Sequence, residues 1–214
     1  MKVKVVKKIL EANDRIAENN RITLRDKGVF CINLMSAPGA GKTTLLSRTL
    51  TALKDRFRFG VIEGDIQGTH DAEVISALGV PVIQINTEGS CHLDANMISD
   101  MLPELPLDDL DVLIIENVGN LVCPAEFDVG ENAKVMLLSL SEGDDKPLKY
   151  PLMFQKSEAL ILNKMDLLPH LDVNVEKIRH DVKALNPKLR VFEVSCRNGE
   201  GLDDWYSWLA ERVR

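Results

Sequence analysis

A glycine-rich segment, residues 36–44, has the composition and spacing of a phosphate-binding loop. It is Ser-Ala-Pro-Gly-Ala-Gly-Lys-Thr-Thr and directly follows an apolar run at residues 30–35. Consecutive backbone N–H groups in such a loop, and the N-terminus of the helix after it, attract phosphate oxygens. We expect the ammonium group of Lys42 to reach the β- and γ-phosphates of a nucleotide and the hydroxyl of Thr43 to bind Mg²⁺.

The same segment departs from the usual pattern at its start. Ser36 stands where the pattern Gly-x-x-x-x-Gly-Lys-Ser/Thr has its first glycine. Gly39 is therefore expected to supply part of the backbone freedom that the loop needs. Further contacts with the nucleotide are expected from Ala40, Gly41 and Thr44. The alternative is a glycine-rich turn that only caps a helix.

A second segment, Asn163-Lys164-Met165-Asp166, follows another apolar run and resembles the guanine-recognition motif of GTPases. A carboxylate only accepts hydrogen bonds, so Asp166 suits the N1–H and exocyclic amine of guanine, a donor pair that adenine lacks. Lys164 would lay its aliphatic stem over the base. Ser195 and Cys196, after the last apolar run, resemble the weaker second base-contacting loop of that class. The alternative is a polar loop in which Asp166 only caps a helix.

Acidic residues follow two further apolar runs and predict an Mg²⁺ site. Asp65 and Asp71 follow the run at residues 59–62, and Glu116 follows the run at residues 112–115. Carboxylates that face a phosphate loop are natural Mg²⁺ ligands. Asp71 is equally expected to cap the next helix. Gly119 would let the backbone approach the γ-phosphate and move when the nucleotide is hydrolysed.

Position 120 bears on the rate of hydrolysis. It holds an asparagine, where Ras-like enzymes have a glutamine that orients the attacking water. With no obvious general base in these segments, we expect slow intrinsic hydrolysis, as in a switch.

Two short segments beside these elements carry soft metal ligands. Cys91-His92 lies after the apolar run at residues 81–85, and Cys123 follows Gly119 closely. Thiolate and imidazole suit Zn²⁺, Ni²⁺ or Cu, whereas Mg²⁺ prefers oxygen. Three ligands do not close a four-coordinate site, but a second subunit related by a two-fold axis would supply the same set. The alternative is that the cysteines are small buried hydrophobic residues and the histidine is solvated.

The elements that must position these residues follow one pattern along the chain. Seven short apolar runs without strict alternation are typical of strands buried on both faces of a parallel sheet; they are residues 30–35, 59–62, 81–85, 112–115, 135–140, 159–162 and 191–194. Amphipathic segments lie between them, at residues 43–54, 71–78, 93–102, 173–185 and 203–212. This alternation predicts a doubly wound α/β domain with a mostly parallel sheet. Residues 141–151 are expected to form a long polar loop.

The N-terminal residues differ from the rest of the chain. Helical spacing of apolar residues predicts an amphipathic helix within residues 1–27, packed on a nucleotide-binding domain of residues 28–214. With 214 residues, a net charge of −7 and no long apolar stretch, the chain is expected to be cytoplasmic. The acidic balance favours neither nucleic acid nor an anionic membrane as a partner.

Taken together, these motifs resemble the HypB family of hydrogenase maturation GTPases, which belong to the P-loop GTPases that dimerise around nucleotide. The stretches that carry the resemblance are residues 36–44, 63–65, 89–94, 116–124, 142–151 and 163–166. The resemblance implies GTP or GDP with Mg²⁺ at the nucleotide site, and Ni²⁺ or Zn²⁺ held by Cys91, His92 and Cys123 at a dimer interface. It also implies a homodimer that depends on nucleotide or metal, a HypA-like small metallochaperone as partner, and the large-subunit precursor of a [NiFe]-hydrogenase as client.

Three alternatives stay open. A related accessory GTPase for urease or a cobalamin enzyme is the nearest, although a urease-type protein would show Cys-Pro-His where this chain has Cys-Pro-Ala at residues 123–125. A small-molecule kinase could use the same phosphate loop, but it would have no reason to select guanine. A metal-binding module with a vestigial nucleotide site is the third.

Overall fold

A parallel sheet forms the centre of the molecule. This computed structural model describes residues 3–66, 68 and 70–213, and among them seven strands form one sheet in the order β3-β2-β4-β1-β5-β6-β7. Every neighbouring pair is parallel. The strands are β1 (Phe30–Ser36), β2 (Phe59–Asp65), β3 (Val82–Asn86), β4 (Val112–Glu116), β5 (Ala133–Ser139), β6 (Ala159–Asn163) and β7 (Arg190–Glu193). The predicted doubly wound α/β fold is confirmed.

The apolar runs form strands because the sheet is covered on both faces. All residues of the central strands β4 and β6 are buried, whereas the edge strands β3 and β7 are partly exposed. A strand buried on both faces reads as a continuous apolar run, which explains why these segments lack alternation.

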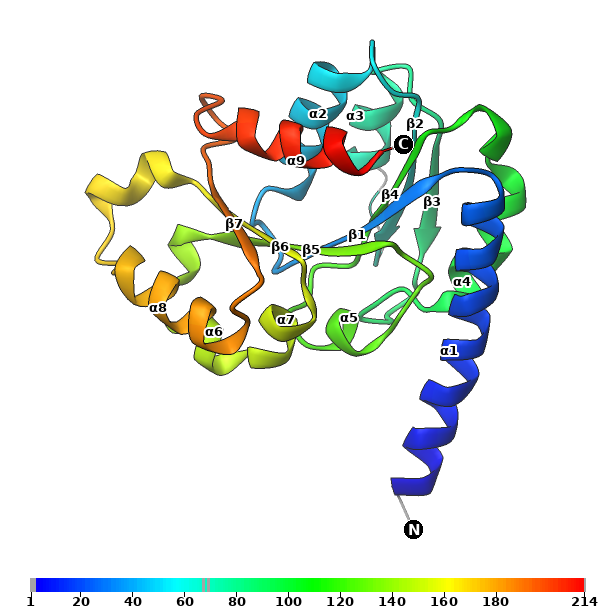
Figure 1. Cartoon of the computed structure of the whole chain (residues 1–214), viewed down its shortest axis with the longest axis horizontal. Helices are drawn as coiled ribbons and strands as arrows, with labels where there is room; N and C mark the ends of the chain where they lie inside the picture. The colour runs from blue at the N-terminus through cyan, green and yellow to red at the C-terminus, as the bar shows by residue number, and fades with distance from the viewer. Residues whose placement is uncertain (1–2, 67, 69, 214) are drawn as a thin grey trace.

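Helices cover the two faces of the sheet (Figure 1). The α-helices are α1 (Val3–Asp26), α2 (Lys42–Leu53), α3 (His70–Ser76), α4 (Ala95–Met101), α5 (Cys123–Glu126), α6 (Lys146–Lys149), α7 (Pro151–Lys156), α8 (Val175–Leu185) and α9 (Leu202–Arg212), and short 3₁₀ helices span Leu102–Glu104, Leu107–Asp109, Leu140–Glu142 and Met165–His170. Helices α2, α3 and α9 pack on one face, and α1, α4, α7 and α8 pack on the other.

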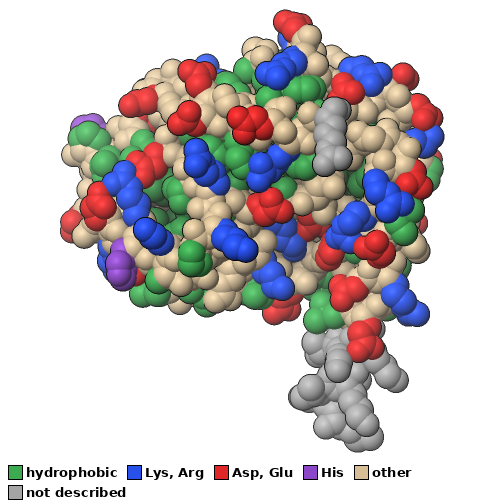
Figure 2. All heavy atoms as spheres, in the orientation of Figure 1, with side chains coloured by type: hydrophobic (Ala, Val, Ile, Leu, Met, Phe, Trp, Pro, Cys, Tyr) green, Lys and Arg blue, Asp and Glu red, His purple; other side chains and the backbone are tan. Residues whose placement is uncertain are grey.

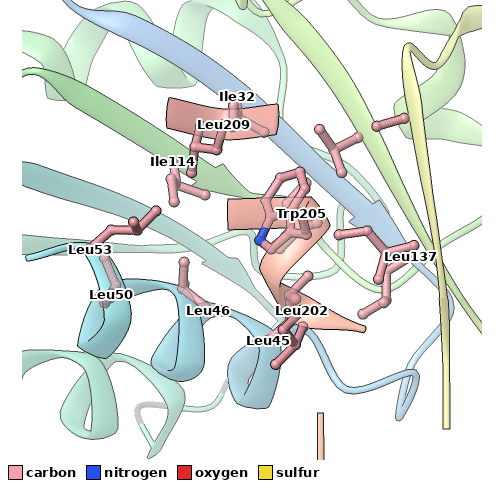
Figure 3. Packing of buried hydrophobic residues seen from close by; sticks show 14 of the residues in the cluster. Ile32, Leu45, Leu46, Leu50, Leu53, Ile114, Leu137, Leu202, Trp205 and Leu209 are labelled. Carbon is pink, nitrogen blue, oxygen red and sulfur yellow. The ribbon is translucent and has the colours of Figure 1, made fainter. Parts of the chain in front are cut away.

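Trp205 of α9 lies at the centre of the core on the first face. Figure 3 shows it surrounded by apolar side chains from α2, β1, β4 and β5. Its indole N–H donates a hydrogen bond of 2.9 Å to the hydroxyl of Thr49, so the one polar atom of this ring is satisfied inside the core. The same packing fixes α2, and with it the start of the helix that follows the phosphate loop.

Helix α1 is docked by polar contacts as well as apolar ones. Ala17 and Leu24 are buried, and Arg21 pairs with Asp128 at 2.7 Å. Gly130 lies so close to the helix that an added Cβ would be 2.6 Å from Cβ of Asn20. Residues 1 and 2 of the expected helix lie outside the described residues.

One feature differs from the sequence expectations. Residues 141–151 are largely helical, with the end of a 3₁₀ helix, α6 and the first residue of α7 in place of one long loop. Pro147 and Pro151 each stand in the first turn of a helix, where a missing N–H costs nothing. The polar composition of this segment had suggested a loop, because helices this short show no apolar periodicity in the sequence.

The surface carries charges of both signs. Lys and Arg side chains are interspersed with Asp and Glu over the face in Figure 2. Within the described part of the chain, no helix is long and apolar enough to cross a membrane.

Candidate nucleotide site and Cys/His cluster

The phosphate loop has the backbone that its glycines predict. Gly39 and Gly41 have φ values of 73° and 106°, in the left-handed region that suits glycine. Helix α2 begins directly after Gly41. Because a glycine has no side chain that could cap the helix, the N–H groups of the first turn of α2 receive no capping hydrogen bond from this residue. The ammonium group of Lys42 lies 3.1 Å from Oγ of Ser36. Ser36, at the place of the usual first glycine, therefore orients the lysine.

The base-reading segment is fastened to the phosphate loop. The side-chain amide of Asn163 donates to the carbonyl oxygen of Ala40 at 2.9 Å and accepts from the N–H of Cys196 at 3.0 Å. Lys164 has a φ of 64° and donates from Nζ to the carbonyl oxygen of Gly39 at 2.8 Å. The structure thus brings the three expected nucleotide loops together at the carboxyl ends of the strands.

A cavity of about 340 Å³ lies between these loops. Its lining residues are Gly41, Thr44, Asn163, Lys164, Asp166, Leu167, Cys196 and Arg197. The carboxylate of Asp166 accepts a hydrogen bond of 2.6 Å from Ser195 Oγ, which fixes its orientation at the rim. A larger hollow, of about 850 Å³, lies beside α7 and α9, and it is lined by none of the expected site residues.

Arg48 is a supporting residue that the motifs did not indicate. It lies on α2 and donates from Nε to the carbonyl oxygen of Cys196 at 3.2 Å and from Nη2 to that of Arg197 at 2.7 Å. It therefore holds the second base-contacting loop against the helix that starts at the phosphate loop. No sequence signal could have found it, because its partners are backbone atoms of a distant segment.

The carboxylate cluster differs in one member from the expected set. Oxygen atoms of Glu63, Asp71 and Glu116 lie within 4.8 Å of one another. Asp65 is not part of the group, because its carboxylate accepts the N–H groups of Ile66 at 2.6 Å and Gly68 at 3.0 Å and so forms a turn. The feature of the sequence that could have indicated Glu63 as a ligand is its charged side chain within a buried strand.

Burial changes the protonation of two of these carboxyls. It raises the pKa of Glu116 to about 8, with Lys42 opposing the shift, and it raises the pKa of Glu63 to about 7, with Asp71 adding to it. One oxygen of Glu63 and one of Glu116 are buried without a hydrogen-bond partner among the described residues. Unpartnered buried carboxylate oxygens that converge on one point fit a hard divalent cation such as Mg²⁺.

The cysteine and histidine residues also converge. Sγ of Cys91 lies 3.0 Å from Sγ of Cys123 and 3.7 Å from Nδ1 of His92. The His92 ring packs on Phe127, with ring centroids 3.9 Å apart, and burial lowers its pKa. A neutral imidazole is the form that binds a metal, so this environment favours ligation.

Residues 116–123 connect the nucleotide side to this cluster. An added Cβ on Gly119 would lie 3.0 Å from the backbone nitrogen of Pro38, so this glycine lies directly against the phosphate loop. The next residue, Asn120, donates to the carbonyl oxygen of Cys91 at 3.3 Å and accepts from Val122 N–H at 2.8 Å. Both polar atoms of the Asn120 side chain therefore bind the backbone of the segments that carry Cys91 and Cys123.

The sequence and fold match characterised proteins along nearly the whole chain. A family described as "CobW/HypB/UreG, nucleotide-binding domain" matches residues 30–193. The hydrogenase maturation factor HypB of Escherichia coli strain K12 is 52% identical over 201 residues, which cover 94% of this chain and 69% of that protein.

Two solved structures are also similar. HypB from Archaeoglobus fulgidus superposes with a TM-score of 0.90 at 38% identity, covering 96% of this chain and all of that one. HypB from Helicobacter pylori in complex with nickel superposes with a TM-score of 0.89 at 40% identity, covering 95% of each chain. From its sequence and its fold, this chain belongs to the HypB hydrogenase maturation factors of the CobW/HypB/UreG family.

Proposed function

We propose that the chain is a GTP-hydrolysing metallochaperone that delivers nickel to a [NiFe]-hydrogenase precursor in the cytoplasm. The observation that carries this proposal is the convergence of Cys91, His92 and Cys123 next to a segment that lies against the phosphate loop. A metal site joined in this way to a nucleotide site allows one ligand to change the affinity for the other.

The choice of guanine is supported by the carboxylate of Asp166. It lines the cavity between the base-reading loops and is oriented by Ser195. A carboxylate there pairs with the two donors of guanine, whereas adenine would leave it unpaired at a cost that enzymes exploit for strict selection. This preference also argues against a small-molecule kinase.

Phosphate binding and hydrolysis would use residues from three segments. Lys42 neutralises the β- and γ-phosphates, and the hydroxyl of Thr43 together with Glu63, Asp71 and Glu116 would hold Mg²⁺, directly or through water. When bound, Mg²⁺ neutralises charge that develops on the phosphates. Turnover is expected to be slow, because Asn120 stands where Ras-like enzymes have a water-orienting glutamine and its amide is hydrogen-bonded to the backbone of Cys91 and Val122.

Nickel would be cargo held by soft ligands. Two thiolates and one imidazole suit Ni²⁺ and Zn²⁺, and they leave a four-coordinate site one ligand short. A second copy of the chain around a two-fold axis would complete the site, so we propose a homodimer that depends on nucleotide or metal. A HypA-like small metallochaperone would be the partner in delivery.

The test is an equilibrium titration of the reduced protein with Ni²⁺ and with Zn²⁺. It is run with GDP and with a non-hydrolysable GTP analogue, and light scattering follows the oligomeric state. We expect metal affinity and dimer fraction to differ between the two nucleotides, and Cys123→Ala to weaken metal binding in both. Cys31→Ala is the control, because Cys31 is buried in the core away from the cluster.

The titration, together with assays of GTP turnover and of phosphate transfer, decides among the alternatives. Metal binding that is identical with both nucleotides would contradict coupled delivery. Phosphate transfer to a small acceptor would favour a kinase, and metal binding without nucleotide turnover would favour a metal-binding module.

A further inference from the structure

One buried side chain, Asn117, touches both the nucleotide side and the metal side of the molecule. It directly follows β4, and its Nδ2 donates to Oδ1 of Asn33 on β1 at 3.1 Å. Its Oδ1 accepts two backbone N–H groups, from Val118 and from Leu93, each at 3.0 Å. The side chain is fully buried. Both lone pairs of the amide oxygen are therefore used, and the orientation of the amide is set by Asn33.

The two N–H groups that share this oxygen belong to different sites. Val118 directly precedes Gly119, whose backbone lies against Pro38 of the phosphate loop. Leu93 directly follows His92 and is itself fully buried. A change in the Val118–Gly119 backbone therefore acts on the same oxygen that holds the backbone next to a metal ligand. A buried N–H that loses its partner is costly, so the two positions are not independent.

Helix α1 holds the far end of the loop that carries Cys91 and His92. Oδ1 of Asn13 accepts the N–H of Ala95 at 2.9 Å, and Nδ2 of Asn13 donates to the carbonyl oxygen of Asp128 at 2.8 Å. Asn20 donates to the carbonyl oxygen of Ala95 at 2.8 Å. These contacts lie away from the phosphate loop. The loop that carries Cys91 and His92 thus lies between an anchor on α1 and the amide of Asn117.

We propose that Asn117 is the positioning residue that transmits the nucleotide state to the Cys/His cluster. This inference rests on the proposed function. A γ-phosphate that draws Gly119 toward it moves Val118 N–H relative to the Asn117 oxygen. The amide then turns or shifts, and Leu93 follows it to keep its hydrogen bond. Because Ala95 is anchored, the movement is confined to the residues around His92.

The test measures the ratio of Ni²⁺ dissociation constants with GDP and with the GTP analogue. If the native protein shows a coupling of about fivefold or more, typical of linked sites, Asn117→Ala is expected to bring the ratio close to one. The matched control is Asn13→Ala, which removes an asparagine amide that holds the same loop from the other side. It is expected to weaken Ni²⁺ binding equally with both nucleotides and to leave the ratio unchanged.

The ratio separates transmission from a merely structural role. A residue that only stabilises the loop lowers affinity in both states and keeps the ratio, so a native-like ratio in Asn117→Ala would overturn the inference. If the ratio of dissociation constants falls as far in Asn13→Ala as in Asn117→Ala, the inference is also overturned. Any variant that loosens the loop carrying Cys91 and His92 would then uncouple the sites. A ratio of one in the native protein would show that nucleotide and metal binding are not coupled. That result would contradict the proposed function itself, and the role of Asn117 with it.

A second variant covers the case in which Asn117→Ala does not fold. Asn33→Ala leaves Oδ1 of Asn117 in place but removes the acceptor that orients its amide. The ratio is expected to fall in this variant too, since an amide that turns freely no longer links Val118 to Leu93. A native-like ratio in a folded Asn33→Ala protein would contradict the role of Asn117.

Discussion

The side-chain amide of Asn163 donates a hydrogen bond of 2.9 Å to the carbonyl oxygen of Ala40, and this contact joins the base-reading loop to the phosphate loop. The two residues lie far apart in the sequence: Asn163 is the last residue of β6, and Ala40 lies in the loop after β1. Because strands β1, β5 and β6 are parallel and adjacent, their carboxyl ends meet at one edge of the sheet, and a short polar side chain is long enough to connect the loops.

This contact leaves no room for a side chain on Gly41. An added Cβ would lie 2.6 Å from Nδ2 of Asn163, and the φ of 106° disfavours any other residue. Gly41→Ala is expected to break the contact and to weaken GDP binding by about tenfold or more, measured by calorimetric titration. Gly28→Ala is the control, because Gly28 also has positive φ but an added Cβ would meet no atom within 4 Å. Similar losses in both variants would mean that a general loss of stability, and not the broken contact with Asn163, is responsible.

Removal of the phosphate-loop lysine tests the phosphate site itself. Lys42→Ala eliminates the cation that Ser36 orients. We expect GTP affinity to fall by at least about tenfold and turnover to be lost, since charge-assisted hydrogen bonds to phosphate are among the strong ones. Phosphate release with Lys183→Ala, an exposed lysine of α8, serves as the reference. Near-native GTPase activity in Lys42→Ala would contradict the phosphate-loop assignment.

The selectivity for guanine is expected to depend on one carboxylate. Asp166→Asn replaces an acceptor by a group that also donates, so the pairing with the two guanine donors is lost. The ratio of GTP to ATP affinity should fall by about tenfold or more, measured by competition with a fluorescent GDP. The exposed Asp172→Asn should keep the native ratio. An unchanged ratio in Asp166→Asn would show that other groups read the base.

The buried carboxyls predict a dependence on pH and on Mg²⁺. In the folded protein the pKa is raised from 4.5 to about 7 for Glu63 and to about 8 for Glu116. Between about pH 4.5 and about pH 8 the folded state binds more protons than the unfolded chain, so these groups make the free energy of unfolding fall as the pH rises. Mg²⁺ binds the deprotonated form and should remove this loss while releasing protons.

Denaturant unfolding across that pH window, with and without Mg²⁺ and GDP, measures the effect. Glu116→Gln should flatten the decline, because the glutamine cannot ionise. Glu104→Gln, on the surface, should leave it as in the native protein. A stability that rises through this window without Mg²⁺ would contradict the buried acidic cluster.

Docking of helix α1 is expected to contribute measurably to stability. Asn20 is buried and donates to the carbonyl oxygens of Ala95 and Val129 at 2.8 and 3.2 Å. Asn20→Ala leaves both carbonyls without this partner, which should cost about 1–3 kcal/mol in the free energy of unfolding. The neighbouring Asn19→Ala lies on the exposed side of the same helix and should change stability by less than about 0.5 kcal/mol. Equal effects would show that helix propensity, not docking, decides the outcome.

The sequence alone was sufficient to predict the strands, the phosphate loop and the family. Continuous apolar runs mark strands that are buried on both faces, and the roles proposed for Gly39, Gly41 and Lys42 depend on local backbone and charge. Such roles are encoded by neighbours in the chain, so their pattern is readable without a structure. The short helices around Pro147 and Pro151 were not readable in this way, because their stability comes from packing on α8 and not from their own residues.

Only the tertiary structure decided which side chains meet across the sheet edge. It grouped Glu63 with Asp71 and Glu116 and left Asp65 in a local turn, although Asp65 was among the expected Mg²⁺ ligands. Arg48 binds the backbone of Cys196 and Arg197, and Asn117 binds the backbone N–H of the distant Leu93; a backbone partner leaves no signature in residue type. The sequence determines which groups are available, whereas the parallel order of the strands determines their distances, and hydrogen bonding and metal binding depend on distance.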